Sequence, residues 1–518
     1  MHEIVGKSLE KISKGAAIVL IGTAIGTALA FATRVIIVRY VSQNEYGIYC
    51  SVINLVNIVA TLSILGLETG VPRQIAFYQA KNDIPKVEGI VSAAIKISII
   101  SGLLFCLFLF VASDFIAIRF FHDQEFADPL KIASAAIPFF VMIISLTAIF
   151  RGFGRVQPNL YFRQILMNIL FILTLIIIII FNLSFLGVLY SFVISTAISF
   201  IAYIIYAISK TPLSLTREVG VAECPLIKDL LLFSLPLFAA GLFDSIPAWS
   251  DTLLLGYFMT PNDVALYNAA SPLAHFLPVA MVASGFLYLP LMAQLYAKGQ
   301  KEEIKRSYAV LTKWIFAFVF PIFLIFMLFP EATLNMFFGS SYIGAASVLQ
   351  ILSIGFFINA ISGPNGITLV IMGNTRFVLL ASLTATITSI ALGIILIPPL
   401  GIIGAASATA SSLLVRNIMV SAKIYTQDGI HPFTKNYLKP IITSSVIVIF
   451  IYLLVTNLVT VISWWMLPVL FVLFSVAYGI SLLLTRSFDN EDIKILLTVE
   501  QTLGLNLTEI KKMLRRFI

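Results

Sequence analysis

The sequence predicts an all-α integral membrane protein with about 14 transmembrane helices: two parallel six-helix repeats that form two lobes, plus two extra helices. Three observations support this prediction: the apolar composition, apolar runs of spanning length, and an internal duplication. Of the 518 residues, 59% are hydrophobic and only 11% are charged. A soluble chain of this length could not bury so much apolar surface, so a bilayer is expected to cover it.

Apolar runs long enough to cross the hydrocarbon core, which takes about 20 helical residues, recur along the chain. The predicted spans are 16–40, 46–70, 88–113, 131–150, 160–181, 185–208, 229–258, 264–291, 308–330, 346–372, 376–397, 400–423, 440–458 and 464–485. The seventh span contains Pro236 and Pro247, and a Gly-Pro-Asn-Gly run interrupts the tenth at 363–366. Such residues free backbone groups within a membrane. They predict either a kink that lines a cavity or a purely structural kink.

The basic residues alternate between loops. The N-terminus, every second loop and the C-terminus hold most of the 33 lysine and arginine residues, whereas the opposite loops hold only Arg39, Arg119 and Lys131. The positive-inside rule therefore predicts that both termini lie in the cytoplasm. The net charge of +8 is explained by contact with anionic lipid headgroups, and we expect no nucleic-acid partner.

Three short motifs recur in the same order at nearly one offset, which indicates a duplicated unit of about 215 residues. The motif pairs are 45–49 with 263–267, 152–155 with 373–376, and 186–188 with 400–402. In the first pair each position keeps its chemistry, from an acid at Glu45 or Asp263 to a tyrosine at Tyr49 or Tyr267. An even number of predicted spans separates the copies, so both have the same orientation in the membrane.

The duplication and the charge pattern together predict four regions. They are a six-helix lobe at 1–210, a second six-helix lobe at 211–430, two extra helices at 431–485, and a cytoplasmic amphipathic tail at 486–518. The tail alternates apolar and basic residues at helical spacing, so we expect it to lie on the inner membrane surface.

Ionisable residues within or at the ends of the predicted spans are the candidate site residues. They are Arg34, Arg39, Lys96, Asp244, Asp251 and Arg416. A charge near the bilayer centre costs about 2.5–3.5 kcal/mol on insertion scales, so each needs a reason. Arginine offers a fork for phosphate oxygens and lysine a mobile point charge. The basic residues therefore favour an anionic substrate in a cavity between the lobes.

Structural alternatives remain open for these charges. Lys96 could pair with Asp244 across the lobe interface, and Asp244 and Asp251 could carry a coupling ion or hold the basic residues in place. Arg39 and Arg416, the latter in the inner third of its span, could reach a nearby interface, as we expect for Glu68.

Motifs for several catalytic classes are absent from the sequence. There is no GxxxxGK[ST] loop, no HExxH, no GxSxG and no Cys/His metal pattern. The three cysteines are scattered and match neither a disulfide framework nor a metal site. We therefore expect no built-in ATPase, no metal and no cofactor.

Two stretches of the sequence resemble a known family. The run Arg39–Tyr49 with Leu65–Glu68, and the run Asp251–Phe258 with Leu266–Ala270, resemble polysaccharide-unit flippases of the multidrug/oligosaccharidyl-lipid/polysaccharide exporter superfamily. The resemblance covers most of the first twelve predicted helices. It implies two lobes in a V shape with alternating access, and a lipid-linked oligosaccharide as substrate.

The resemblance also implies that basic cavity residues meet the phosphate or diphosphate of a polyprenyl or dolichyl carrier. Arg39 and Asp251 fall on family motif positions, whereas Arg34 and Lys96 fit only the general pattern of basic cavity residues. We expect Arg34, Arg39, Lys96 and Arg416 to bind this phosphate. Asp244 and Asp251 are expected either to couple H+ or Na+ or to pair structurally.

The sequence thus predicts a monomeric flippase of the cytoplasmic membrane, and not an enzyme. Three alternatives stay open: a multidrug or organic-cation exporter of the same superfamily, a peptidoglycan-precursor flippase, and a membrane glycan polymerase. The deep basic residues and the two extra helices argue against the multidrug exporter. The peptidoglycan branch also has fourteen helices, but its arginine-rich pattern is missing here. The lack of a sizeable external loop argues against a polymerase.

Overall fold

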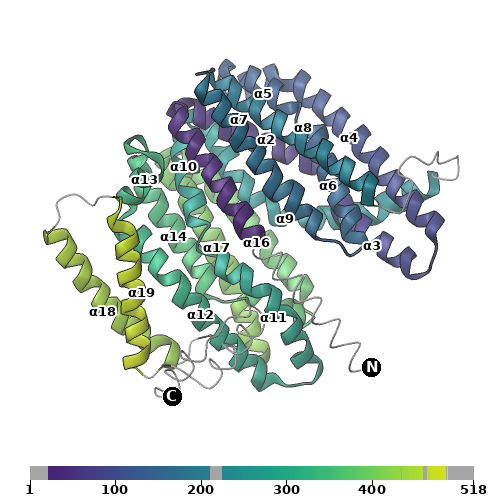
Figure 1. Cartoon of the computed structure of the whole chain (residues 1–518). Coiled ribbons are helices and arrows are strands. Elements are labelled where there is room, and N and C mark those ends of the chain that lie inside the picture. The colour runs from purple at the N-terminus through teal and green to yellow at the C-terminus, as the bar shows by residue number, and fades with distance from the viewer. Residues whose placement is uncertain (1–21, 211–223, 433–434, 459–463, 486, 488–518) are drawn as a thin grey trace. The chain divides into compact units, whose positions relative to one another are not determined.

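The computed structural model describes residues 22–210, 224–432, 435–458, 464–485 and 487, and every regular element in these ranges is a helix. Helices lie over each of the predicted spans (Figure 1). Ten of them, or 11 if one bent pair counts as a single span, are long and apolar enough to cross a membrane. The all-α membrane fold is therefore confirmed, while the total of fourteen spans stays a prediction. Apart from Ser487, the predicted tail lies outside the described residues.

The chain divides into two compact units, which we call the N-terminal unit (Ile18–Ala265) and the C-terminal unit (from Leu266). The N-terminal unit contains the helix Gly22–Tyr40, α2 (Gln43–Ser63), α3 (Leu67–Ala80), α4 (Ile84–Arg119), η1 (Gln124–Phe126), α5 (Ala127–Ser134), α6 (Ile137–Gly152), η2 (Asn159–Leu166), α7 (Met167–Ile180), α8 (Phe185–Lys210) and α9 (Cys224–Phe258). The helix α10 (Pro261–Ala274) begins in this unit and continues into the next.

The C-terminal unit contains the remaining helices. They are α11 (Val279–Ala297), α12 (Lys301–Leu328), α13 (Pro330–Phe338), η4 (Ser340–Ala345), α14 (Ala346–Ile361), α15 (Asn365–Ile371), α16 (Thr375–Leu400), α17 (Ile402–Asp428), α18 (Lys435–Leu458) and α19 (Met466–Leu484). The extra helices α18 and α19 lie side by side, and α19 packs against α12 (Figure 1). A buried cluster of Phe316, Phe320, Tyr478 and Leu482 forms this contact.

The repeated acid-tyrosine motif opens a helix in both copies by the same capping chemistry. In the first copy, Ser42 and Glu45 form a capping box at the start of α2, with Glu45 Oε2 2.8 Å from the Ser42 backbone nitrogen. In the second, Thr260 and Asp263 exchange the corresponding bonds, with 3.1 Å between Asp263 Oδ2 and the Thr260 nitrogen. A capping box satisfies backbone donors that a helix start leaves open. The motif therefore has a structural role in both copies.

The long helix α9 packs against α2, α3 and α4 through close backbone approaches. It runs from Cys224 to Phe258 through Pro236 and Pro247 without interruption. Just beyond its end, a Cβ on Gly47 of α2 would lie 1.7 Å from the Pro261 carbonyl oxygen. Near its other end, a Cβ on Gly70 of α3 would lie 1.9 Å from the Ser234 hydroxyl oxygen. Only glycine fits against the Pro261 carbonyl, whereas a larger residue at position 70 would require the Ser234 side chain to move.

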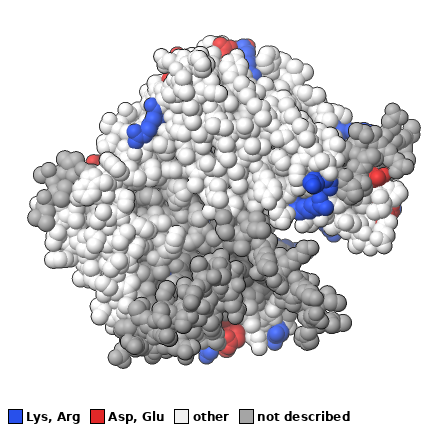
Figure 2. Space-filling model, in the orientation of Figure 1, with Lys and Arg blue, Asp and Glu red and all other residues white. Residues whose placement is uncertain are grey.

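The outer surface of the spanning helices is apolar. On α4, large side chains that include Leu104, Leu107 and Val111 are exposed, as is typical of a lipid-facing surface. Charged side chains are few on the face shown in Figure 2, and most of the described surface there is uncharged.

Candidate functional site

Arg34 lies on the first described helix, within electrostatic range of the first copy of the repeated motif. Its side chain is exposed, and its charge acts on Tyr46, Tyr49 and Cys50 of α2. The two tyrosine rings are buried and stack with their centroids 6.2 Å apart. The guanidinium is therefore near a packed aromatic surface while remaining accessible to a ligand.

The other predicted charges of the N-terminal unit lie on three helices. Arg39, in the last turn of the helix Gly22–Tyr40, and Lys96, in α4, are exposed. Asp251 of α9 is only 8% exposed. Asp244 lies two turns earlier on the same helix, and the structure describes its backbone only. The structure thus places all four residues in one compact unit, on helices that include the packed pair α4 and α9.

Arg416 belongs to the C-terminal unit and lies beside the break between α14 and α15. It is half-buried, and its Nη2 atom is 3.5 Å from where a Cβ on Gly366 would lie. The helix α17 continues to Asp428, beyond the predicted end of the span, and Arg416 lies near the middle of this helix.

The break itself is confirmed, and an amide network surrounds it. The helix α14 ends at Ile361 and α15 begins at Asn365. Asn417 accepts a hydrogen bond from Asn365 at 3.0 Å and donates to Asn359 Oδ1 at 3.1 Å and to the Leu413 carbonyl at 2.8 Å. Asn365 also donates to Ser421 at 3.1 Å. Buried polar groups need such partners, since an unmet one costs about 1–3 kcal/mol.

The chain packs tightly at the same break. Gly363 has a φ of +66°, and a Cβ there would lie 2.2 Å from the Thr312 hydroxyl oxygen. The Tyr308 hydroxyl donates to the Ser362 carbonyl, which supplies a partner for one backbone group freed by the break. The interruption is thus a packed feature of the C-terminal unit in which glycine is required.

A cluster of three charges, which the sequence did not reveal as a group, lies in the N-terminal unit. Glu68 Oε1 is 3.8 Å from Arg151 Nη1 and 4.0 Å from Arg163 Nη1. The sequence predicts that the Glu68 side chain reaches the nearby membrane interface, whereas in the structure two arginines lie beside it. No sequence signal joins these positions, because they are some 80 to 95 residues apart and meet only through the packing of α3, α6 and η2.

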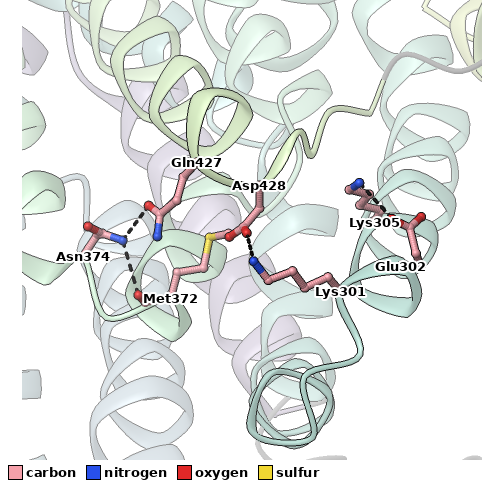
Figure 3. Close-up of polar contacts among 7 residues, drawn as sticks. All are labelled: Lys301, Glu302, Lys305, Met372, Asn374, Gln427 and Asp428. Atoms are coloured by element: carbon pink, nitrogen blue, oxygen red, sulfur yellow. Dashed lines mark hydrogen bonds and ion pairs between the residues drawn. The ribbon is translucent and has the colours of Figure 1, made fainter.

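Hydrogen bonds and an ion pair connect helix ends at one end of each copy. In the C-terminal unit, Lys301 Nζ lies 2.5 Å from Asp428 Oδ1, and Asn374 donates to Gln427 Oε1 at 2.8 Å (Figure 3). In the N-terminal unit, Arg155 donates to the Lys210 carbonyl at 3.1 Å. The loop after the fourth helix of each copy is thus tied to the end of the sixth, at the end predicted to face the cytoplasm.

Among the described residues, no group of three or more His, Cys, Asp or Glu side chains is placed to hold a metal ion. Among the described candidate site residues, the arginines and Lys96 have the chemistry that suits an anion.

Three curated proteins are similar in sequence to this chain. A curated relative, an uncharacterized membrane protein of Methanocaldococcus jannaschii, is 24% identical over 77% of this chain and 81% of its own. A putative O-antigen transporter of Shigella flexneri is 22% identical over 75% of this chain and 91% of its own. A probable low-salt glycan biosynthesis flippase of Haloferax volcanii is 24% identical over 33% of this chain and 36% of its own.

Solved structures show the same fold. The lipid II flippase MurJ in an inward closed conformation matches with a TM-score of 0.71 at 15% identity, covering 90% of this chain and 98% of its own. An inward-facing multidrug resistance MATE family transporter matches with a TM-score of 0.66 at 16% identity, covering 79% of this chain and 98% of its own.

Two family models match the chain. The MatE model matches residues 236–395, and the model described as polysaccharide biosynthesis protein matches residues 12–296, more than half of the chain. The chain therefore belongs to the polysaccharide biosynthesis protein family, within the multidrug/oligosaccharidyl-lipid/polysaccharide exporter superfamily.

Proposed function

We propose that the protein is a flippase that moves a lipid-linked oligosaccharide across the cytoplasmic membrane by alternating access. The observation that carries the proposal is the pair Arg34 and Lys96, two exposed cations on helices that are otherwise apolar enough to span a membrane. A charge within a spanning helix is costly, so each of these cations calls for a role there. A guanidinium and an ammonium group suit the oxygens of a phosphate or diphosphate on a polyprenyl or dolichyl carrier.

The chemistry of the substrate explains why lipid surface and cation are needed together. The sugar would cross along the polar residues, while the carrier chain stays in the bilayer against the apolar helix surfaces. The names of relatives support this reading, since they include a glycan biosynthesis flippase and an O-antigen transporter. Arg39 and Arg416 would add to phosphate binding, and Asp244 and Asp251 would couple H+ or Na+ or hold the basic residues in place. Both termini would lie in the cytoplasm, and the protein would act as a monomer.

The proposal is tested by glycan export in a strain whose own copy of the gene is deleted. Arg34→Ala and Lys96→Ala should each reduce surface glycan at least tenfold at equal protein level, because each removes a phosphate-binding charge. Arg119→Ala is the matched control, since Arg119 is an exposed cation in the last turn of α4, the helix that carries Lys96. Full export by both Arg34→Ala and Lys96→Ala would overturn the phosphate role.

A second candidate is a multidrug exporter of the same superfamily, which the MatE match over residues 236–395 favours. Acidic residues in the substrate path would serve a cationic drug, and Asp251 is the described candidate. Increased drug susceptibility of the deletion strain, with unchanged surface glycan, would favour this function over the first.

A further inference from the structure

The cluster of Glu68, Arg151 and Arg163 contains more positive charge than its carboxylate can neutralise. Both ion-pair distances, 3.8 and 4.0 Å, exceed the distance of a hydrogen bond. Neither arginine donates a hydrogen bond to another described residue, so N–H donors of both guanidinium groups remain for a ligand. Two guanidinium groups beside one carboxylate leave a net charge of about +1 in a region of spanning helices.

The backbone around the cluster is specialised at each of its three positions. Glu68 lies in the first turn of α3, which follows Leu65 at φ 50° and Gly66 at φ 79°. Arg163 lies on η2, an eight-residue π-helix, a type of helix that is rare and is frequent at functional sites. Arg151 lies in the last turn of α6, where a helix end favours a cation. A positive φ at a leucine is costly and persists where the surrounding structure imposes it.

The three side chains are reachable from outside. Their exposed fractions are 45% for Arg151, 43% for Glu68 and 32% for Arg163. The Arg163 guanidinium carbon lies 5.5 Å from the centre of the Phe140 ring, so the ring supports one face of the guanidinium. Paired guanidinium groups with open N–H donors match the geometry of phosphate oxygens.

We propose that Arg151 and Arg163 form a binding site for a phosphate carried on a lipid, with Glu68 as the built-in counter-ion that the phosphate displaces. The cluster lies at the end of the helices that the charge pattern predicts to be cytoplasmic, where a carrier lipid would arrive. Glu68 repels the phosphate and so keeps its affinity low enough for release, a requirement of any transport site. The inference rests on the proposed function only for the identity of the carrier, since the phosphate chemistry belongs to the cluster itself.

Binding of farnesyl diphosphate to the purified full-length protein in detergent tests the site without any transport step. Arg151→Gln and Arg163→Gln should each raise the Kd about tenfold. Glu68→Gln should lower the Kd severalfold, because it removes the competing carboxylate. Arg155→Gln is the matched control: it removes a nearby arginine that binds the Lys210 carbonyl, and it should leave the Kd unchanged. Farnesol, which lacks the phosphate, should not bind at this site.

The opposite sign expected for Glu68→Gln makes the test decisive, because misfolding cannot tighten binding. If Glu68→Gln raised the Kd as the arginine variants do, the cluster would be a structural ion network and the proposal would fail. An equal loss in Arg155→Gln would also overturn it, since the effect would be general charge. Repeating the measurement in nanodiscs with and without phosphatidylglycerol separates the sources. Competition by phosphatidylglycerol assigns the site to headgroup phosphates, and its absence assigns it to the diphosphate carrier. If the wild-type protein bound farnesyl diphosphate at this site but its gene were not needed for glycan export, the proposed function alone would fail.

Discussion

The two copies of the duplicated unit connect their fourth and sixth helices with different bonds. In the first copy, the hydroxyl oxygens of Thr147 and Tyr203 are 3.5 Å apart. In the second copy, the Asn365 amide donates to the Ser421 hydroxyl at 3.1 Å. The first copy keeps a continuous helix, α6, at this point, whereas the second breaks between α14 and α15. The difference shows where the second copy exchanged regular backbone for side-chain hydrogen bonds.

For charged residues the comparison is reversed, because here the first copy has the additional side-chain contacts. The first copy has Glu68, Arg151 and Arg163 close together. The motif pair 152–155 with 373–376 gives the apolar Met372 as the counterpart of Arg151 in the second copy. The duplication thus preserved a scaffold, while the first copy gained accessible charge and the second a broken helix with an amide network. In a transporter, the first feature suits ligand binding and the second suits a change of helix direction.

The largest expected effect tests the close contact beside the first repeated motif. Gly47→Ala would place a Cβ 1.7 Å from the Pro261 carbonyl oxygen, so it should destabilise the protein by about 3 kcal/mol. The second copy already has an alanine at the corresponding position, Ala265. Ala265→Gly should therefore cost only about 1 kcal/mol. Denaturant titration in detergent measures both, and equal small effects would show that the two backbones are not in close contact.

The second prediction compares the amide network with its counterpart. Asn417→Ala removes three hydrogen bonds, and Asn359 and Asn365 each lose one partner. The substitution should therefore lower the free energy of unfolding by about 2–3 kcal/mol. Ser199, on the sixth helix of the first copy, makes one bond, at 2.6 Å, to the Phe162 carbonyl. Ser199→Ala should cost about 1 kcal/mol. A larger loss for Ser199→Ala, by the same titration, would reverse the assignment of the polar core to the second copy.

The third prediction concerns a feature that the copies share. Glu45→Ala and Asp263→Ala each remove the reciprocal half of a cap and should each cost about 1 kcal/mol, because the capping bonds are alike. Thermal unfolding of both variants under one set of conditions checks the equality. A twofold or larger difference would indicate that one copy of the motif has a role beyond capping.

The smallest effect depends on pH. Asp83 precedes α4 and accepts a hydrogen bond from Lys86, whose ammonium lies 3.0 Å away, and this bond lowers the pKa of Asp83 below its usual value. A lowered carboxyl pKa stabilises the fold above the unfolded pKa, and this stabilisation is lost as the pH falls through the folded pKa. Asp83→Asn should therefore slightly reduce stability at neutral pH and leave it unchanged at strongly acidic pH. Melting temperatures of the wild-type protein and the variant at both pH values test this. A difference between the two proteins that is the same at both pH values would show that Asp83 ionisation does not contribute to stability.

The sequence predicted the features that depend on local chemistry. Apolar runs placed the helices, the Gly-Pro pair at 363–364 placed the break, and the acid-tyrosine motif placed two helix starts. It also placed Arg34 and Lys96 on helices that are long and apolar enough to span a membrane. Each of these signals lies within a few residues of the structure that it predicts.

The features that escaped prediction all depend on which helix faces meet. Lys313 lies near the predicted start of a span, yet it is buried within α12 and donates to the carbonyl of Ser487, beyond α19, at 2.9 Å. The cluster of Glu68, Arg151 and Arg163 and the network around Asn417 likewise join helices far apart in the sequence. Helix rotation and packing decide such contacts, and periodicity alone does not reveal them.

The most direct test of the account is translocation of a fluorescent lipid-linked oligosaccharide by the purified protein in proteoliposomes, followed by protection of the fluorophore from an impermeant quencher. The account predicts that the wild-type protein moves the lipid, that Arg34→Ala with Lys96→Ala slows it at least tenfold, and that Arg119→Ala does not. A wild-type protein that moves no lipid-linked oligosaccharide, or a double variant that moves it at the full rate, would contradict the assignment of phosphate binding to the first copy.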